Sequence, residues 1–257
     1  MNNQLKETML AGTRAVGTFF ELGNMNAMEA LTGTGLDFVV IDAEHGSSDT
    51  ETITDLIRAA ESSTITPLVR IADVSHREIQ RILDAGAMGL IVPCLRTMQE
   101  IEDLIKLSKY SPTGSRGFAP TRSSRWGEAQ WAKGSLESLM AVCNRETLII
   151  PQCETLEMLD IIEEVAKQDG VDGIFIGPYD LSIAMGIPGQ FHEPAFAAAV
   201  LRIINAGKSA GKLLMVYAGS PEDAVRHFNL GIDGVAVSMD TMVLQESMKT
   251  LVSRSRG

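Results

Sequence analysis

The sequence predicts a single α/β domain over residues 1–257, folded as a (β/α)8 (TIM) barrel. Eight short apolar runs recur along the chain, and stretches with apolar residues at three- and four-residue steps separate most of them. Near-continuous apolar strands that alternate with helices indicate a parallel sheet covered by helices. Eight such units ending in a helix fit a closed barrel better than a doubly wound sheet. A dinucleotide-binding sheet would have G-x-G-x-x-G after the first strand, but the nearest match, residues 33–35, ends a predicted helix.

Each predicted strand is an apolar run that β-branched or aromatic residues favour as extended chain. In order, the strands are expected at 15–22, 37–43, 66–72, 88–95, 147–153, 172–178, 213–219 and 233–239. Helices are expected at 25–35, 50–63, 75–87, 97–111, 156–170, 193–211, 220–233 and 239–255. Ser75 and Ser220 stand at plausible N-caps, and Gly86 follows a predicted helix end. One connection, residues 110–146 between the fourth helix and the fifth strand, is long; a loop of that length without secondary structure is usually functional or an interface element.

Composition narrows the class of protein. A net charge of −11 argues against nucleic acid and anionic membrane surfaces as partners. The three cysteines, Cys94, Cys143 and Cys153, form no CxxC pair and are expected to be reduced thiols. The N-terminal residues do not resemble a signal peptide, and the apolar runs are too short to span a bilayer. We therefore expect a soluble, cytoplasmic protein whose partner is a small molecule.

Ionisable residues gather at one end of the predicted strands, the end at which (β/α)8 enzymes place their active sites. At or just beyond the carboxyl ends lie Asp42, Glu44, His45, Arg70, Arg96, Glu154 and Asp180. Before the strands stand Asp37, Asp172, Asp233 and Lys212, which we expect to be solvated turn residues. This asymmetry favours an enzyme.

Glu154 and Asp180 end adjacent strands, so both carboxylates can point into the mouth of the barrel. Two carboxylates with several waters commonly hold Mg²⁺ or Mn²⁺ when the substrate completes the octahedron. Two other interpretations remain open. Each residue could be an ordinary helix N-cap, or the two could form the acidic pair of a glycosidase, which would leave Arg70 and His45 unexplained.

Arg70 lies within an apolar strand, where arginine is almost never buried without an anionic partner. It could form an internal salt bridge to Glu44 or Glu154, or it could bind a carboxylate or a developing oxyanion of the substrate. Of the four histidines, His45 alone is expected at the rim of the mouth, where a histidine beside carboxylates suits acid/base work near neutral pH.

The lysines argue against one mechanism. A Schiff-base aldolase needs a lysine that projects into the mouth from a strand's carboxyl end. All eight lysines are expected on helices, loops, the N-terminus or, for Lys212, the wrong end of a strand. The loops after the seventh and eighth strands are acidic and poor in glycine, so a phosphorylated substrate is not expected.

The segments VVIDAEHG, PLVR, PQCE and FIGPYDLS, in this order, resemble the HpcH/HpaI family of metal-dependent (class II) pyruvate aldolases. The similarity extends along almost the whole chain, including GSRGF and RSSRWG in the long connection and DGVAVSMD near the end. The resemblance implies reversible cleavage of 4-hydroxy-2-oxo acids to pyruvate and an aldehyde through a pyruvate enolate, with Mg²⁺, Mn²⁺ or Co²⁺ as cofactor. It also implies a hexamer built from dimers, in which the last helix packs on a neighbouring barrel.

By position, the resemblance implies a role for each motif residue. Glu154 and Asp180 would be the metal ligands, Arg70 would contact the keto oxygen, and His45 would be the acid/base group. Asp42 would lie near a water on the metal, and Asp84 would be the partner of His45. Asp84 ends the third predicted helix, on the face opposite the mouth, so it could act only across a subunit contact or through an unusual chain path. The remaining implied substrate contacts are Gln152, Gly177, Pro178 and Tyr179.

The chain departs from the family pattern around the mouth. Phe19 stands where many relatives have tryptophan, and Tyr179 fills a position that is often alanine or asparagine. These changes affect the expected aldehyde, not the pyruvate half. Arg116, Arg122 and Arg125 could meet a distal substrate carboxylate or form salt bridges. Two rival functions are an acyl-CoA lyase of the citrate or malyl-CoA lyase type, for which this short acidic chain offers few basic residues, and a non-catalytic binding barrel.

Overall fold

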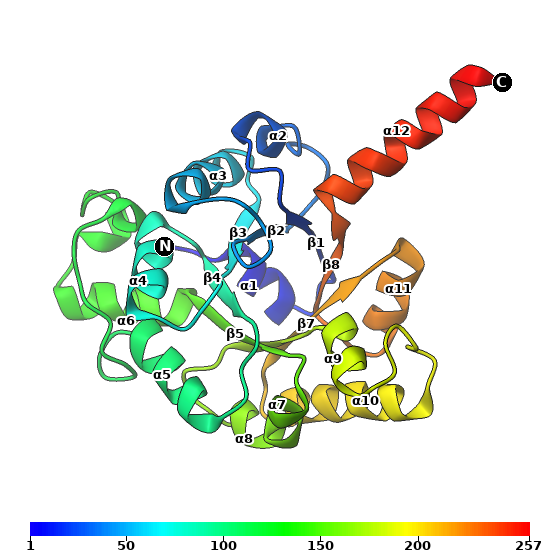
Figure 1. Cartoon of the computed structure of the whole chain (residues 1–257). Coiled ribbons are helices and arrows are strands. Elements are labelled where there is room, and N and C mark those ends of the chain that lie inside the picture. The colour runs from blue at the N-terminus through cyan, green and yellow to red at the C-terminus, as the bar shows by residue number, and fades with distance from the viewer.

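The computed structural model describes all residues from Met1 to Gly257 and confirms the closed barrel of eight parallel strands, paired in chain order from β1 to β8 and back to β1 (Figure 1). Every strand lies within its predicted range. Their bounds are β1 Ala15–Phe20, β2 Phe38–Asp42, β3 Thr66–Arg70, β4 Gly89–Val92, β5 Leu148–Cys153, β6 Gly173–Ile176, β7 Leu213–Ala218 and β8 Gly234–Met239.

All eight predicted helices are present, with shifted ends. They are α2 Met25–Glu29, α3 Thr50–Ser62, α4 His76–Ala85, α5 Met98–Ser108, α7 Leu156–Asp160 with α8 Ile162–Ala166, α10 Pro194–Ser209, α11 Pro221–Asn229 and α12 Asp240–Arg256. The expected N-caps are confirmed, since Ser75 accepts from Glu78 N and Ser220 from Asp223 N. Gly86 ends α4 at a left-handed φ of 106°, which favours glycine.

Three further helices complete the fold: α1 Gln4–Leu10, α6 Leu136–Glu146 and α9 Pro178–Ala184. The connection 110–146 is therefore not a structureless loop. It contains two short 3-10 turns, Arg122–Ser124 and Gln130–Ala132, and ends in α6, which Ser135 caps.

The core has two layers, as strand alternation requires. One set of side chains points into the barrel and forms a cluster that includes Phe19, Val40, Leu68, Ile150 and Phe175. The other set packs outward against the helices in a larger cluster of 46 buried residues. No helix is both long enough and apolar enough to cross a membrane.

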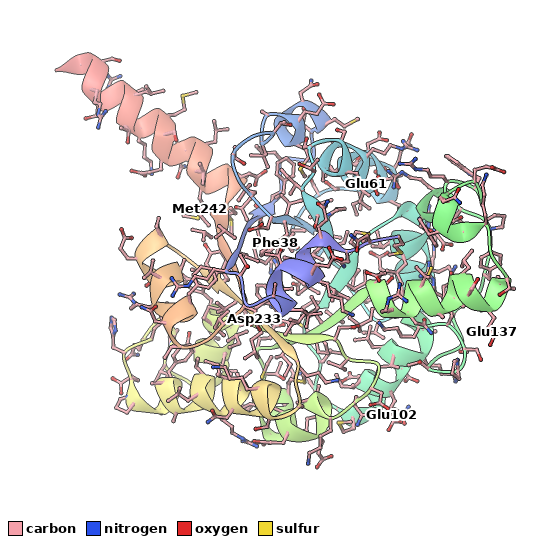
Figure 2. All side chains as sticks on the ribbon, turned by 180° about the vertical axis from the view of Figure 1, so that it is seen from behind. Phe38, Glu61, Glu102, Glu137, Asp233 and Met242 are labelled. Atoms are coloured by element: carbon pink, nitrogen blue, oxygen red, sulfur yellow. The ribbon has the colours of Figure 1, made fainter.

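α1 closes the end of the barrel at which the strands begin, hereafter the closed end. Its Leu5 and Met9 are buried in the inner cluster, and Asn3 donates through Nδ2 to the carbonyls of Met88 and Glu146 at 3.0 and 2.8 Å. Seen from behind, α1 crosses the barrel near Phe38 and Asp233 (Figure 2). The N-terminal segment therefore acts as a plug.

The charged residues before the strands are not solvated turn residues, and that expectation was wrong. Asp37, Asp172 and Asp233 each accept a backbone N–H of the preceding strand, from Val16, Ile149 and Leu214 at 2.8 to 3.0 Å. Lys212 donates to the carbonyls of Gln168 and Val171. Strand starts in a closed barrel leave N–H groups without a sheet partner, and buried N–H groups must be satisfied.

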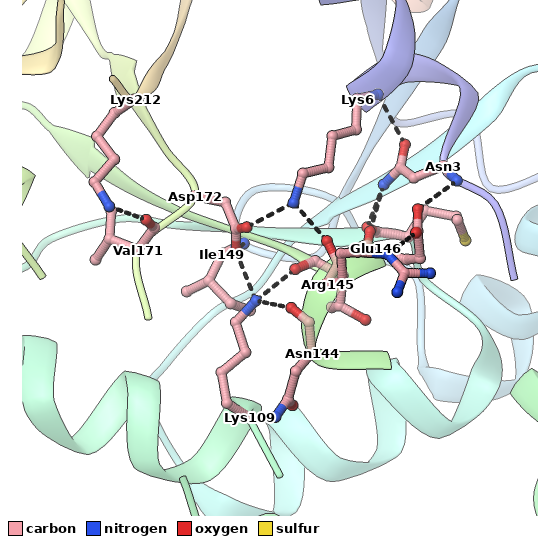
Figure 3. A network of polar contacts seen from close by, with 12 residues as sticks. Asn3, Lys6, Lys109, Asn144, Arg145, Glu146, Ile149, Val171, Asp172 and Lys212 are labelled. Carbon is pink, nitrogen blue, oxygen red and sulfur yellow. Dashed lines mark hydrogen bonds and ion pairs between the residues drawn. The ribbon is translucent and has the colours of Figure 1, made fainter. Parts of the chain in front are cut away.

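Asp172 is the centre of a larger polar network at the closed end (Figure 3). Its two oxygens meet Lys6 at 3.0 Å and Lys109 at 2.7 Å. Lys109 also donates to the carbonyls of Asn144 and Thr147, so all three of its donors are used.

α12 differs from every other long helix because none of its residues is buried. It leaves β8 and projects away from the barrel (Figure 1). Several large apolar side chains on it are exposed: Met242, Val243, Leu244, Met248, Leu251 and Val252.

Candidate active site

The open end of the barrel, at which the strands finish, collects the polar residues that face inward. On β2, β3 and β5 the inner cluster contains Val40, Leu68 and Ile150. Two residues further on, the same face carries Asp42, Arg70 and Gln152, and Glu154 follows on the β5 side. On each of these strands, therefore, the inward-facing side chain changes from apolar to polar over two residues, and the mouth of the barrel is polar.

Arg70 is buried and pairs with Asp42 on the neighbouring strand, to which it is registered. Its Nε and Nη2 donate to the two oxygens of Asp42 at 2.9 and 2.6 Å, and Nε lies 3.3 Å from Glu44 Oε2. The expected salt bridge to Glu44 is confirmed; the bidentate partner is Asp42, not Glu154. Burial alone would lower the pKa of Arg70, but Asp42, Glu44 and Glu154 raise it overall, so the guanidinium stays charged.

Glu154 is buried at the centre of the mouth. Its Oε1 accepts the backbone N–H of Cys94 at 2.6 Å, and its Oε2 accepts from Nε2 of Gln152. Burial raises the pKa of Glu154; the two hydrogen bonds oppose this shift, whereas the nearby charges of Asp180 and Glu44 add to it. Glu154 therefore lies in a region of negative charge to which Asp180 and Glu44 contribute.

Cys94 orients Glu154 through its backbone N–H, a role that the sequence did not indicate. It has a left-handed φ of 59°, uncommon for a residue other than glycine, and this conformation belongs to the loop that aims its N–H at Glu154. Its Sγ lies 3.7 Å from Glu44 Oε1. Burial and the charges of Glu154 and Glu44 raise the pKa of the thiol to about 11, so it is neutral near pH 7.

Asp180 lies in the first turn of α9 and is exposed. The N-cap of α9 is Gly177, and that of α7 is Thr155, so the interpretation of Asp180 and Glu154 as helix caps is wrong. Gly177 leaves space for two side chains of the mouth, since a Cβ there would lie 2.9 Å from Glu154 Oε2 and 3.0 Å from Gln152 Nε2. Pro178, buried at the first position of α9, starts the helix that carries Asp180.

The donor set at the mouth fits a hard divalent cation. Glu154 and Asp180 are the candidate donors, and no group of three or more His, Cys, Asp or Glu residues is arranged to bind a metal. Gln152 adds a buried side-chain oxygen without a hydrogen-bond partner, which points to a missing donor or cation nearby. Two carboxylates that leave most positions to water and substrate are typical of Mg²⁺ and Mn²⁺ sites.

His45 lies at the rim, with 65% of its side chain exposed, and its Nε2 is 3.9 Å from Glu44 Oε2. The turn that carries it is held by Asp42, whose Oδ1 accepts the backbone N–H groups of Glu44 and His45 at 3.1 and 3.4 Å. Gly46 follows because a Cβ there would lie only 2.1 Å from the carbonyl of Asp42. Asp42 therefore positions both Arg70 and the histidine loop.

The structure does not bring Asp84 to this mouth within one chain. It lies at the end of α4, where Arg116 Nη2 and Gln80 Nε2 donate to it at 2.7 and 2.8 Å. Arg122 pairs with Glu61 at 2.6 Å. These contacts lie at the closed end, so a single chain does not place Arg116 or Arg122 near a distal carboxylate of a substrate in the mouth.

Arg125 is exposed and, with Arg122, lines a cavity of about 650 Å³. The cavity walls include Met1, Pro67 and Trp126. Met1 and Pro67 lie by the plug and at the start of β3, so this cavity also belongs to the closed end and is separate from the polar mouth.

One side of the mouth is aromatic. Phe19 of β1, Tyr217 of β7, Tyr179 of α9 and Phe191 form a continuous series of edge-to-face contacts. The guanidinium of Arg70 lies over the ring of Phe19, 4.8 Å from its centroid. Tyr217 was not singled out from the sequence, although its position two residues after inward-facing Met215 is a usable signal.

Comparison with known proteins agrees with the sequence motifs. Residues 15–247 match the sequence model described as HpcH/HpaI aldolase/citrate lyase. The 4-hydroxy-2-oxo-heptane-1,7-dioate aldolase of Salmonella arizonae is 31% identical over 256 residues, covering 99% of this chain and 95% of that protein.

Two solved structures are similar along the whole chain. An HpcH/HpaI aldolase/citrate lyase family protein from Burkholderia cenocepacia is 29% identical, with a TM-score of 0.90 and full coverage of both chains. The citrate synthase SbnG is 30% identical, with a TM-score of 0.88, and the match covers 98% of this chain and 97% of that one.

Proposed function

Because this chain belongs to the HpcH/HpaI aldolase/citrate lyase family, we propose that it is a divalent-metal-dependent pyruvate aldolase. It reversibly cleaves 4-hydroxy-2-oxo acids to pyruvate and an aldehyde. The observation that carries the proposal is the position of Glu154, a buried carboxylate held by two hydrogen bonds at the open end of the barrel, with Asp180 and Arg70 beside it.

Glu154 and Asp180 would hold the cation, which is Mg²⁺, Mn²⁺ or Co²⁺. When bound, it would act as a Lewis acid that stabilises negative charge on the keto oxygen of pyruvate. The chain prepares this site in advance, since Cys94 and Gln152 orient Glu154 and Gly177 leaves space beside it. Gln152, Gly177, Pro178 and Tyr179 lie around the same position and are proposed to contact the substrate.

Arg70 adds positive charge where the enolate oxygen would develop. Its side chain is locked by Asp42 and by the Phe19 ring, so little conformational entropy is lost when the substrate binds. Charge-assisted donors of this kind are worth more in the transition state, because the oxyanion forms there. Arg70 would therefore lower the activation free energy for forming the enolate, without itself exchanging a proton.

His45 is proposed to move the proton. In the cleavage direction it would take the proton of the 4-hydroxyl as the C3–C4 bond breaks, and the C3 carbanion would then be protonated. Its exposure suits a group that must exchange protons with water. Asp84 remains proposed as its partner, reached only from a neighbouring subunit.

The assembly is proposed to be a hexamer built from dimers in which α12 packs on a neighbouring barrel. The helix has no buried residue in one chain and exposes six large apolar side chains, an arrangement that a single soluble helix does not favour. Truncation before Asp240, followed by light scattering, should lower the molecular mass; a truncated chain that keeps the full mass would exclude α12 as the assembly contact.

The central test couples pyruvate release from a 4-hydroxy-2-oxo acid to lactate dehydrogenase, with and without EDTA. Activity should disappear after chelation and return with Mg²⁺, Mn²⁺ or Co²⁺. A second measurement follows exchange of the C3 protons of pyruvate in deuterated water by NMR, which needs no aldehyde. Pyruvate release that survives thorough chelation would contradict the metal-dependent mechanism.

A second candidate is condensation of the citrate synthase or acyl-CoA lyase type, because citrate synthase SbnG is as similar to this chain as the aldolase of Salmonella arizonae is. Incubation with oxaloacetate and acetyl-CoA, with detection of citrate and free thiol, tests it. Products in this assay, together with no proton exchange into pyruvate, would favour the second candidate.

A further inference from the structure

The aromatic side of the mouth forms a wall that runs from the polar centre to solvent. We define the aromatic wall as Phe19, Tyr217, Tyr179 and Phe191. Successive ring centroids are 5.9, 5.8 and 5.1 Å apart, with interplanar angles of 65°, 65° and 87°. These values are those of favourable edge-to-face pairs.

Exposure increases from Phe19 to Tyr179. Phe19 is 3% exposed and lies beneath Arg70, Tyr217 is half-buried, and Tyr179 is 49% exposed. A molecule whose reacting end lies beside Arg70 would thus extend its other end along Tyr217 and Tyr179. Tyr179 is exposed in the free protein, so an apolar ligand group that covers its ring would gain buried apolar area.

The two tyrosine hydroxyls are free to bind a ligand. Tyr179 uses only its main-chain carbonyl, which accepts from Ser182 Oγ at 2.7 Å, and the Tyr217 side chain makes no hydrogen bond within the chain. Burial, with Tyr179 and Glu21 nearby, raises the pKa of Tyr217, so its hydroxyl remains a donor.

The charges beside the wall disfavour an anionic ligand. Glu21 lies near Tyr217. The basic residues around the mouth are already paired: Arg70 with Asp42 and Glu44, Arg96 with Glu157, and Arg226 with Asp223. Within one chain, a second carboxylate on the ligand would meet Glu21 and no unpaired arginine, which costs binding energy.

We infer that the aromatic wall binds the aldehyde half of the substrate and selects an uncharged aldehyde that carries an aromatic ring. This inference rests on the aldolase function proposed above. In the addition direction, pyruvate C3 loses a proton and bonds to the aldehyde carbon, while the aldehyde oxygen gains a proton. The ring of the acceptor aldehyde then stacks on Tyr179 and Tyr217. The name of the Salmonella relative implies a substrate with a second carboxylate, and the aromatic wall has no residue that would bind one.

The test compares two acceptors, benzaldehyde and succinic semialdehyde, at saturating pyruvate. We expect a higher kcat/KM for benzaldehyde in the unaltered enzyme. In Tyr179→Ala, kcat/KM for benzaldehyde should fall roughly tenfold, mainly through KM, because the aromatic contact and the area it buries are lost. The kcat/KM for succinic semialdehyde should change much less, so the ratio of kcat/KM for benzaldehyde to that for succinic semialdehyde should fall.

Three further variants keep the test sharp. Tyr179→Phe and Tyr217→Phe retain the rings, so the preference for benzaldehyde should persist. Any change in kcat/KM should then reflect only the lost hydroxyl contact. Phe118→Ala removes a side chain of similar exposure, 40%, that packs on Tyr110 away from the mouth, and the acceptor ratio should not move. Circular dichroism of each variant checks the fold.

Two outcomes overturn the inference. One is a kcat/KM for succinic semialdehyde equal to or above that for benzaldehyde; the other is an acceptor ratio that Tyr179→Ala leaves unchanged. Exchange of pyruvate C3 protons separates this failure from failure of the proposed function. Exchange without addition to benzaldehyde refutes the acceptor assignment alone, whereas absence of exchange refutes the aldolase function and the acceptor assignment together.

Discussion

At the closed end of the barrel, the partly buried carboxylate Asp172 pairs with two lysines, whereas at the open end the buried carboxylate Glu154 has the negative charges of Asp180 and Glu44 nearby. Asp172 directly precedes a strand and Glu154 directly follows one, so the strand pattern places both carboxylates at the ends of the barrel. At the closed end, Lys109 uses all its donors and the aspartates before the strands satisfy backbone N–H groups. At the open end, Gln152 keeps an unpaired buried oxygen.

The difference indicates a division of labour between stability and function. Saturated ion pairs at the closed end hold the plug, the strand starts and α5 together. Unbalanced negative charge at the open end costs folding free energy and is retained because it favours a cation, a compromise that active sites commonly show. Four substitutions test this division, from the largest expected effect to the smallest.

Lys109→Met should lower the free energy of unfolding by about 3 kcal/mol, because it leaves Asp172 and two carbonyls without their buried partner. Urea unfolding followed by circular dichroism measures this. Lys106→Met, on an exposed position of the same helix, is the control and should change stability by less than about 0.5 kcal/mol. Equal effects in the two variants would contradict a special role for the closed-end network.

Glu154→Gln should reduce kcat/KM for pyruvate release by at least about 100-fold, since it removes a proposed metal ligand. Its stability without added metal should stay equal to or exceed that of the unaltered protein, because the change removes a buried negative charge near Asp180 and Glu44. Glu157→Gln, three residues further on and exposed, is the matched control. A variant that loses activity only by unfolding would refute the division.

Arg70→Lys should reduce kcat/KM about tenfold or more, since an ammonium group cannot keep two parallel hydrogen bonds to Asp42 and also contact the substrate. The loss should appear mainly in kcat, where charge develops in the transition state. Arg96→Lys, at the end of β4 and exposed, serves as the control. An Arg70→Lys enzyme with a raised KM and unchanged kcat would indicate ground-state binding instead.

His227→Gln tests an exception at the closed end, where Nδ1 of His227 is buried without a partner. Burial lowers the pKa of His227 below its usual value, so below about pH 6.5 the unfolded chain binds a proton that the folded chain does not. Stability should therefore fall as pH drops from 6.5 towards the lowered pKa, and His227→Gln should reduce that slope. His192→Gln, at an exposed position, should leave it unchanged.

Much of the open end could be predicted from the sequence because strand alternation is local. A period of two places Asp42, Arg70 and Glu154 on the inner face as soon as the strands are recognised. The same rule was not applied to Tyr217, which the structure places in the aromatic wall. Asp37, Asp172 and Asp233 were misjudged because exposure was inferred from charge alone, without asking which N–H groups a strand start leaves unpaired.

The sequence by itself determined the barrel, the order of its strands and the set of ionisable residues at their carboxyl ends. These depend on periodicities of two and about 3.6 residues, which any short window of the chain displays. Only the tertiary structure decided that Arg70 pairs with Asp42, that Cys94 N–H holds Glu154, and that four distant aromatic residues meet in one wall. Such contacts depend on the register and closure of the whole barrel, which no local pattern contains.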